Sequence, residues 1–439
     1  MLFGWKTKQK MIKYFKDIAD IYFNKRMISM LLLGFSSGFP LPLVFGTLSF
    51  LLKDYGIAYA SIGAISLVKI PYSLKWLWSP IVDNVKIPFL YKMGRRRSWA
   101  IITQILLGVA IFLMSTVNPQ QHLGLIAVFA FITSFLSATQ DIILDAYRVE
   151  SFNNEPEKLS SGVAIFVLGY RLGLIFSGAG AIYLASKISW SAVYVVMSFG
   201  ILIGMAAIIC SKEAVKYEYK ILNFDTKNIK EFFNNSLINP FKNFLKNEKW
   251  FWILAFIFTY RLSDSYFGPM SNPFYDDMGF TKEEIAFVTK IYSIIMTIIG
   301  GLLGGIVVLK LGMRKSLLLF GFTQCITTML FSVQAYYGHN MPLFMVIVAL
   351  EYLSSGLATT AFVAYISSLC NKLYTATQYA LLSSVMSLSR DLFSATSGVV
   401  YEYAETAFPN YGWVIFFIIS GFMSLPSVFI ILFCLKKDK

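Results

Sequence analysis

The sequence predicts an all-α polytopic membrane protein, and both its composition and its apolar runs support this fold class. Of 439 residues, 56% are hydrophobic and only 14% are charged, whereas soluble domains carry about 25% charged residues. Apolar runs recur from about residue 27 to residue 434, and many reach the roughly 20 residues that cross a bilayer. The runs are continuous rather than alternating, so they fit helices and not a β-barrel. A soluble enzyme is excluded.

The apolar runs predict twelve transmembrane helices in two six-helix halves, separated by a polar stretch. The first six helices are expected at approximately residues 27–50, 60–80, 99–117, 122–146, 162–185 and 190–210. The second six are expected at approximately residues 250–272, 283–309, 316–336, 342–369, 379–402 and 412–434.

The distribution of positive charge predicts the orientation of these helices. Of 38 Lys and Arg residues, 29 fall in the gaps on one side and three on the other, and the rest lie within spans. Because positive residues collect on the cytoplasmic side, we expect both termini in the cytoplasm. The net charge of +14 then belongs to the membrane surface, and we expect no nucleic-acid partner.

The same pattern predicts five regions along the chain. We expect a cytoplasmic tail at 1–26, six-helix bundles at 27–210 and 250–435, a cytoplasmic linker at 211–249 and a short tail at 436–439. The linker has apolar residues at helical spacing, which predicts an amphipathic helix on the inner leaflet. These residues are Phe232, Phe233, Leu237, Phe241, Phe244 and Leu245. The alternative is a solvated linker whose aromatic residues touch the bundle.

An internal repeat relates the two halves at an offset near 219 residues. GRRR at 94–97 corresponds to GMRK at 312–315, and Arg171 corresponds to Arg390. Six spans, a basic linker and six more spans are the arrangement of the major facilitator fold. The first basic loop, with Asp83 upstream of Arg95, Arg96 and Arg97, is therefore expected to act as a conformational switch.

Small residues at GxxxG spacing predict close helix contacts in both halves. The pairs are Gly34–Gly38, Gly169–Gly173, Gly300–Gly304 and Gly301–Gly305. Glycines at this spacing let helix backbones approach each other in lipid. Tight static packing and surfaces that slide during transport explain them equally well.

Several charged residues lie inside the predicted spans of the first half. A charge at mid-membrane is costly unless it faces a cavity or a partner. Asp141 and Asp145 share one helical face at spacing i,i+4, with Gln140 beside them and Arg148 three residues beyond. A buried carboxyl that exchanges protons makes Asp141 the candidate for coupling to a proton gradient. The alternative is a structural ion pair, for instance with Arg171.

The remaining intramembrane charges are Lys69, Lys75, Arg261, Asp264, Lys290, Glu351, Arg390 and Asp391. Arg261 and Asp264 either pair locally or face a cavity, and we expect Asp264 to contact substrate or protons. Arg171, Arg261 and Arg390 could bind an anionic substrate through charge-assisted hydrogen bonds. For Glu351 and Lys290, structural pairing is favoured.

The sequence carries no signature of a cofactor, a metal site or a built-in motor. The four cysteines form no CxxC motif, and His122 and His339 stand alone. No GxxxxGK[ST] motif occurs, which excludes an ATP motor of the P-loop kind. A membrane-embedded acyl- or glycosyltransferase would need clustered acidic and His residues, which are missing. We expect no cofactor and no enzyme activity, and we expect a gradient to supply the energy.

The chain resembles the AmpG family of muropeptide permeases, a branch of the major facilitator superfamily that also includes acetyl-CoA transporters. The resemblance spans nearly the whole chain. It is carried by LGFSSGFPLPL at 33–43, KWLWSPIVD at 75–83, GRRRSW at 94–99, SATQDIILDA at 137–146, VLGYRLG at 167–173, FVAYISSLCNK at 362–372 and TATQYALLSS at 375–384.

This resemblance implies proton-driven import of anhydro-muropeptides, anionic sugar-peptides from cell-wall recycling, across the bacterial inner membrane. The family's span-four residues fall on Gln140, Asp141 and Asp145. Its Tyr-Arg pair falls on Tyr170 and Arg171, and its span-seven pair falls on Arg261 and Asp264, where Lys is usual in place of Arg. Longer family members carry extra C-terminal helices.

Two alternatives remain beside this function. The cargo could be another anionic solute, such as acetyl-CoA or a nucleotide, although few cations inside the spans are available for phosphates. A membrane sensor that binds ligand without moving it is also compatible with the sequence. We expect a monomer surrounded by membrane lipids, with a small-molecule substrate and protons as its partners.

Overall fold

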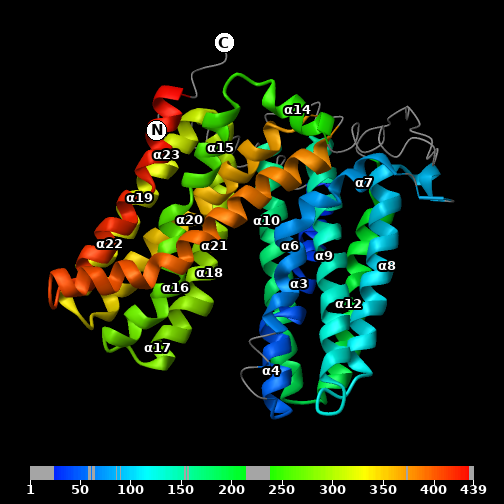
Figure 1. Cartoon of the computed structure of the whole chain (residues 1–439), viewed down its shortest axis with the longest axis horizontal. Helices are drawn as coiled ribbons and strands as arrows, with labels where there is room; N and C mark the ends of the chain where they lie inside the picture. Colours follow the sequence, from blue (N-terminus) through cyan, green and yellow to red (C-terminus); the bar gives the residue numbers. More distant parts are fainter. Residues whose placement is uncertain are drawn as a thin grey trace, which may run out of the picture. The chain divides into compact units, whose positions relative to one another are not determined.

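The computed structural model describes two helical units (Figure 1). The described residues are 24–57, 61, 65–85, 87–88, 90–152, 155, 158–213, 238–371 and 374–434. Every regular element in these ranges is a helix. The chain divides into compact units at Met1–Phe224 and Asp225–Lys439.

The first unit begins at Asn24, whose side chain accepts a hydrogen bond from the backbone N–H of Met27 and so caps the first helix. Gly94, with φ of +109°, turns the chain immediately before α8, a conformation that favours glycine. The elements are α2 (Lys25–Gly38), α3 (Pro40–Val44), α4 (Gly46–Asp54), η1 (Ser66–Lys69), α6 (Ile70–Leu74), η2 (Lys75–Leu77), α7 (Ser79–Asn84), η3 (Tyr91–Met93), α8 (Arg95–Ser115), α9 (Leu123–Ser151), α10 (Leu159–Ile175), η5 (Phe176–Gly180), α11 (Ala181–Ala185) and α12 (Trp190–Cys210).

The second unit repeats the glycine turn, because Gly312 (φ +79°) lies between α18 and α19. A capping box formed by Thr281 and Glu284 begins α17. The elements are α14 (Asn239–Leu245), α15 (Trp250–Thr259), α16 (Leu262–Asp277), α17 (Lys282–Phe287), η8 (Val288–Tyr292), α18 (Ser293–Leu311), α19 (Met313–Tyr337), α20 (Met341–Ser368), α21 (Thr375–Ala407), α22 (Gly412–Phe422), α23 (Leu425–Phe429) and η9 (Ile430–Cys434).

Nine helices among the described residues are long and apolar enough to cross a membrane. They correspond to nine of the twelve expected spans, and the count of twelve stays a prediction. The expected second span contains short helices and 3-10 turns around Pro71, and residues 62–64 lie outside the described ranges. The seventh divides into α15 and α16 at Arg261. The eleventh is the single helix α21 of 33 residues, and it includes the charged residues Arg390 and Asp391.

The glycines of the first half lie where two helix backbones touch. A Cβ atom at Gly34 would be 2.0 Å from the carbonyl oxygen of Phe166, and one at Gly38 would be 2.1 Å from that of Tyr170. In return, Gly169 and Gly173 meet the backbone of α2 just as closely. Only glycine permits this approach, so α2 and α10 form the predicted close pair.

Glycines serve the same purpose in the second unit, between α18 and α20. A Cβ atom at Gly300 would lie 2.1 Å from the carbonyl oxygen of Leu353, and Gly304 packs against Leu357. From the other helix, a Cβ atom at Gly356 would lie 2.3 Å from the carbonyl oxygen of Thr297. Gly301 and Gly305 are also on α18, but a Cβ at Gly301 would have only ordinary contact with Thr360.

The internal repeat recurs as pairs of equivalent contacts. The indole N–H of Trp190 donates to Asp54 at 2.8 Å, and that of Trp413 donates to Asp277 at 3.0 Å. Both members of the second pair lie 223 positions after those of the first. Each contact joins the end of the first long apolar segment in its unit to the start of the last.

A second equivalent contact lies at the opposite helix ends. Arg97 donates to the carbonyl oxygens of Ile208 and Ile209 at the end of α12. Arg314 donates to those of Ile431 and Leu432 in η9. In both units, an arginine of the basic loop therefore binds the carbonyl oxygens that the last helix leaves unpaired.

The expected linker helix is described only in its second part, α14. Phe244 is buried and Leu245 is exposed, and the Gln378 amide of α21 donates to the carbonyl oxygen of Pro240 at 3.2 Å. Phe232, Phe233 and Leu237 lie outside the described residues, as do most of the two terminal tails. The membrane position of this helix and its domain boundaries stay predictions.

Candidate functional site

The predicted carboxylate Asp141 lies on α9, half-buried, and it has a hydroxyl partner on α2. Ser37 donates to Asp141 Oδ1 at 2.5 Å. The amide of the neighbouring Gln140 donates to the backbone carbonyl of Ser36 at 2.6 Å. Adjacent residues of α9 therefore hold adjacent residues of α2, and Asp141 lies next to the helix that packs on α10.

The second carboxylate of α9, Asp145, is bound locally. Its Oδ1 atom is 2.9 Å from the guanidinium of Arg148. Arg148 is buried and lies 4.6 Å from the ring centre of Phe166. Asp141 is within electrostatic range of Lys75, Asp145 and Arg148. The two carboxylates on this face therefore differ, since Asp145 has an adjacent cation and Asp141 has a hydroxyl.

Two tyrosines lie within electrostatic range of one another beside Asp141. Tyr72, on α6, interacts with both Asp141 and Tyr170. Its buried hydroxyl interacts with the hydroxyl of Ser137, which lies on the same helix as Asp141. Tyr170 and Arg171 are half-buried on α10 and make interactions of their own. The predicted residues Asp141 and Tyr170 therefore lie together, and Tyr72 joins them.

In the second unit, Arg261 occupies the break between α15 and α16. Its guanidinium forms an ion pair with Asp264, the local pairing that the i,i+3 spacing allowed. It also donates to the hydroxyls of Thr359 and Ser355 on α20. The ion pair is partly accessible, since the side chains of Arg261 and Asp264 are 25% and 20% exposed.

Asp264 is connected to a second carboxyl group through one amide. The side-chain N–H₂ group of Gln324 lies 2.8 Å from Asp264 Oδ1 and 3.0 Å from Glu351 Oε1. Thr328 also donates to Glu351 Oε1, at 3.1 Å. Glu351 is 2% exposed. The sequence favoured structural pairing with a charged group for Glu351. In the structure, the groups that donate hydrogen bonds to it are neutral.

The remaining predicted cations are more exposed. Arg390 pairs with the adjacent Asp391 at 3.4 Å, and their side chains are 62% and 58% exposed. Lys69 lies 5.1 Å from the centre of the Phe45 ring. The side chain of Lys290 lies outside what the structure describes.

The predicted switch loop forms a buried ion cluster. Arg96 is fully buried, and its guanidinium contacts Asp83 and Glu150, each at 2.7 Å. Arg95 contacts Glu150 at 2.9 Å. Arg97 lies apart from this cluster and binds the end of α12. The cluster therefore joins α7, the start of α8 and the end of α9.

Glu213, just beyond α12, binds the start of α8 beside this cluster. Its carboxylate accepts hydrogen bonds from the backbone N–H groups of Arg96 and Arg97, at 2.9 and 3.2 Å, where a helix N-terminus favours negative charge. Burial nevertheless raises the pKa of Glu213, since desolvation outweighs these two hydrogen bonds. Glu150 and Glu213 were not among the predicted site residues.

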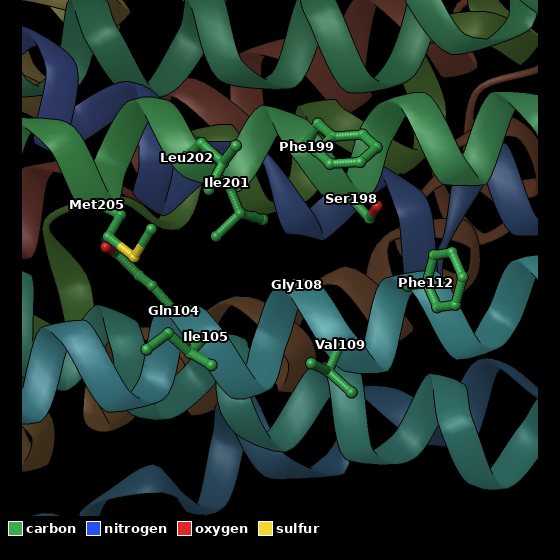
Figure 2. Close-up of a pocket in the computed structure, with 10 residues that line it drawn as sticks. All are labelled: Gln104, Ile105, Gly108, Val109, Phe112, Ser198, Phe199, Ile201, Leu202 and Met205. Carbon is green, nitrogen blue, oxygen red and sulfur yellow. The ribbon is translucent and has the colours of Figure 1, made fainter.

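The structure also contains an apolar groove between α8 and α12, of about 290 Å³ (Figure 2). Its lining includes Ile105, Phe112, Phe199 and Leu202, and no charged side chain. A hydrophilic anion would find no counter-charge there. Elsewhere among the described residues, no cluster of His, Cys, Asp and Glu is arranged to hold a metal ion.

Comparison with known proteins agrees with the fold and the repeat. The sequence pattern of the Major Facilitator Superfamily matches residues 27–389 and also 253–439. The human organic anion transporter MFSD10 superposes with a TM-score of 0.65 at 12% identity, covering 93% of this chain and 98% of its own. At this identity, the likeness concerns the fold alone. The class is therefore a multi-pass membrane transporter of the major facilitator type.

Relatives that align over nearly their full length narrow this class. A Rickettsia conorii protein named "Putative transporter AmpG 4" is 36% identical over 96% of this chain and 99% of its own. A Rickettsia prowazekii protein with the same name but numbered AmpG 3 is 35% identical over 92% and 94%. A Haemophilus influenzae protein is 33% identical over 93% and 96%. The chain belongs to the AmpG family of the Major Facilitator Superfamily.

Proposed function

We propose that the protein imports anhydro-muropeptides across the bacterial inner membrane and that the proton gradient drives this import. It acts as a monomer, by alternating access between the two sides of the membrane. The observation that carries the proposal is Asp141, a half-buried carboxyl in an AmpG chain, bound to a hydroxyl of α2 beside Tyr72 and Tyr170.

Asp141 is the proposed proton carrier because its partner is neutral. A carboxylate fixed by an adjacent guanidinium, as Asp145 is by Arg148, holds its charge strongly. The hydroxyl of Ser37 can donate to an ionised carboxylate and can accept from a protonated one. Both states of Asp141 therefore have a hydrogen-bond partner, as a group that loads and unloads a proton requires.

The proposed cargo is anionic and hydrophilic, and the spans offer cations and aromatic hydroxyls to such a ligand. Arg171 follows Tyr170 on α10, and Arg261 is partly exposed at the break between α15 and α16. Guanidinium groups bind carboxylates with two parallel hydrogen bonds. Gln140, Asp145, Asp264 and Arg390 remain proposed members of this polar path.

Energetics support proton coupling. One proton that moves inward releases about 2.3 kcal/mol for each 100 mV of membrane potential. A sequence without a P-loop has no ATP site of that kind to draw on.

The buried cluster of Asp83, Arg95, Arg96 and Glu150 is proposed to hold one of the two conformations until transport rearranges it, with Arg97 bound to α12.

The experiment expresses the chain in bacteria that lack their own muropeptide permease and follows uptake of labelled anhydro-muropeptide. Uptake by the wild-type protein should fall to background when a protonophore is added. The Asp141→Asn variant should lose at least about 90% of gradient-driven uptake, because the amide cannot carry the proton. Asp276→Asn, which changes an exposed carboxyl of α16, should retain wild-type uptake.

Two results would contradict the proposal. Normal membrane expression without muropeptide uptake would refute the cargo, and acetyl-CoA and nucleotides would then be tested in its place. Uptake that persists with protonophore and in Asp141→Asn would refute proton coupling through this residue. Ligand binding without any uptake would identify a sensor.

A further inference from the structure

Glu351 is a buried carboxyl in the second unit that forms no ion pair with any described residue. Its Oε1 atom accepts hydrogen bonds from Gln324 and Thr328. Its Oε2 atom is buried and has no hydrogen-bond partner among the described residues. A carboxylate in such a position costs far more free energy than the neutral carboxylic acid.

The charge balance of its neighbourhood is consistent with one bound proton. Arg261 is the cation of this cluster, and Asp264 already neutralises it. Gln324 links Asp264 to Glu351 with the two hydrogens of one amide. If both carboxyls were ionised, the cluster would carry a net negative charge in the interior of the bundle.

We propose that Glu351 is a proton-binding site of the second unit, that the proton resides on Oε2, and that Arg261 links its occupancy to binding of an anionic substrate. Oε1 already accepts two hydrogen bonds, which leaves Oε2 as the oxygen that carries the hydrogen. The inference rests on the proposed transport function and adds a second protonation site to it.

The groups that surround Glu351 come from several helices. From α16 come Asp264 and Tyr275, and Arg261 precedes this helix; Tyr275 is within electrostatic range of Glu351. From α19 come Gln324, Thr327 and Thr328, none of which changes its charge.

Other elements packed on α20 carry charges that are engaged or lie apart. Arg390 and Asp391 of α21 pair with each other. Arg314 of α19 binds the carbonyl oxygens of η9. On α18, Lys310 lies in the last turn. The side chain of Lys290, on η8, lies outside the described part of the chain.

Arg261 supplies the link because an anionic substrate competes with Asp264 for its guanidinium. When the substrate takes Arg261, Asp264 loses its counter-charge, and the negative potential at the Gln324-bridged pair rises. A proton at Glu351 is then bound more tightly. By linkage, a proton at Glu351 must favour anion binding at Arg261 by the same factor. Proton and anion therefore bind together and leave together, which is the requirement for symport.

The test uses the full chain, purified and reconstituted in liposomes, with Glu351→Gln as a permanently neutral substitute of similar shape. Two reactions are measured with labelled anhydro-muropeptide: accumulation driven by an imposed proton gradient, and counterflow without a gradient. Glu351→Gln should lose at least about tenfold in accumulation, because one coupled proton is missing. Counterflow should remain within about twofold, because exchange needs no proton release.

Glu402→Gln is the matched control, since it removes an exposed carboxyl of α21 in the same unit. It should behave as the wild-type protein in both reactions. Accumulation by Glu351→Gln at the wild-type level would overturn the inference while leaving muropeptide transport intact. If the wild-type protein takes up no muropeptide at all, the proposed function fails, and the following measurement decides on Glu351 separately.

A measurement on the unsubstituted chain covers the case in which Glu351→Gln does not fold. Dicyclohexylcarbodiimide enters apolar regions and reacts with protonated carboxyl groups, and mass spectrometry locates the adduct. Glu351 should be labelled, and labelling should decrease as the pH rises. Absence of the adduct at Glu351 at acidic pH, while other intramembrane carboxyls are labelled, would overturn the inference.

Discussion

Ser37 and Gln324 have comparable roles in the two units. Each is an uncharged side chain that donates to an intramembrane carboxylate from a neighbouring helix, Ser37 to Asp141 and Gln324 to Asp264. Neutral donors hold a carboxyl in place without supplying a counter-charge, and a hydroxyl can donate to the ionised form or accept from the protonated one. This distinguishes Asp141 from Asp83, which is held by a buried guanidinium, and from Asp264, which Arg261 also binds.

The buried cluster of Asp83, Arg95, Arg96 and Glu150 carries a prediction at the residue scale. Glu150→Gln leaves two arginines with one carboxylate in a place where Arg96 is fully buried. Removing one partner from a buried ion network costs about 3–5 kcal/mol. We expect the melting temperature in detergent to fall by about 6 °C or more.

The control for this prediction is Glu155→Gln, in the loop that follows α9. Arg26 and Lys158 bind Glu155 at the surface, and the hydrogen bond from Arg26 lowers its pKa. Exposed pairs contribute about 0–1 kcal/mol, so this variant should melt close to the wild-type protein. This small contribution is present above the usual carboxyl pKa and is lost as the pH falls through the lowered one. Equal melting of the two variants would contradict the special role of the buried cluster.

At this scale, sequence identified residue types better than partners. The i,i+3 spacing allowed local pairing of Arg261 with Asp264 beside a cavity-facing position, and the structure contains this ion pair. Asp145 and Arg148, also three residues apart, form a second ion pair. Glu150 lies 54 residues from Arg96 and Gln324 lies 60 from Asp264, and no spacing rule reaches that far. One signal in the sequence could have indicated Glu150. It is a carboxylate with no assigned ion-pair partner, at the end of α9 that lies on the side of the basic loops.

At the scale of helices, the contact between α2 and α10 carries the next prediction. Gly38→Ala would place a Cβ atom 2.1 Å from the carbonyl oxygen of Tyr170. The obstacle is backbone, which no side-chain rotation removes, so the helices must separate at a cost of about 1–3 kcal/mol. Thermal unfolding in detergent measures this, and uptake should decline because Tyr170 moves relative to Asp141.

Gly46→Ala is the matched control on α4. A Cβ atom there meets nothing within 4 Å, and alanine is the better helix former by about 1 kcal/mol. Its melting temperature should equal or slightly exceed that of the wild-type protein. A Gly38→Ala variant that melts like Gly46→Ala would show that the close backbone contact is dispensable.

Sequence predicted the uniform long helices and described the broken ones less well. Continuous apolar runs give α8, α12 and α19 within a few residues. The expected second and seventh spans are divided because proline lacks the backbone donor that a continuous helix needs, and because Arg261 lies at a break where its side chain reaches α20. Hydropathy describes average polarity and carries no information about such breaks.

For the whole molecule, the two compact units predict that the chain tolerates a break between them. Co-expressed fragments 1–224 and 225–439 follow the observed division. Domains with their own cores fold as units, so we expect at least about one third of the uptake of the intact chain. Membrane association of both fragments and uptake of labelled muropeptide provide the measurement.

A break after Asn118, between α8 and α9, is the control. It divides the first unit, where α8 packs on α9 and α12, and should abolish uptake. If both pairs of fragments failed equally, the two units would not be autonomous.

The two halves and the repeat were visible in the sequence because basic loops recur. The equivalent Trp–Asp contacts were not visible, since tryptophan at a span end indicates only an interface.

Those Trp–Asp contacts also bear on how the protein is made. Asp54 lies near the start of the first half and Trp190 near its end, so their hydrogen bond fastens the first bundle once its last helix has left the ribosome. About half of the chain is still unsynthesised at that moment. The nascent first half therefore has its own closing contact before the second half is translated, and Asp277 and Trp413 repeat the step.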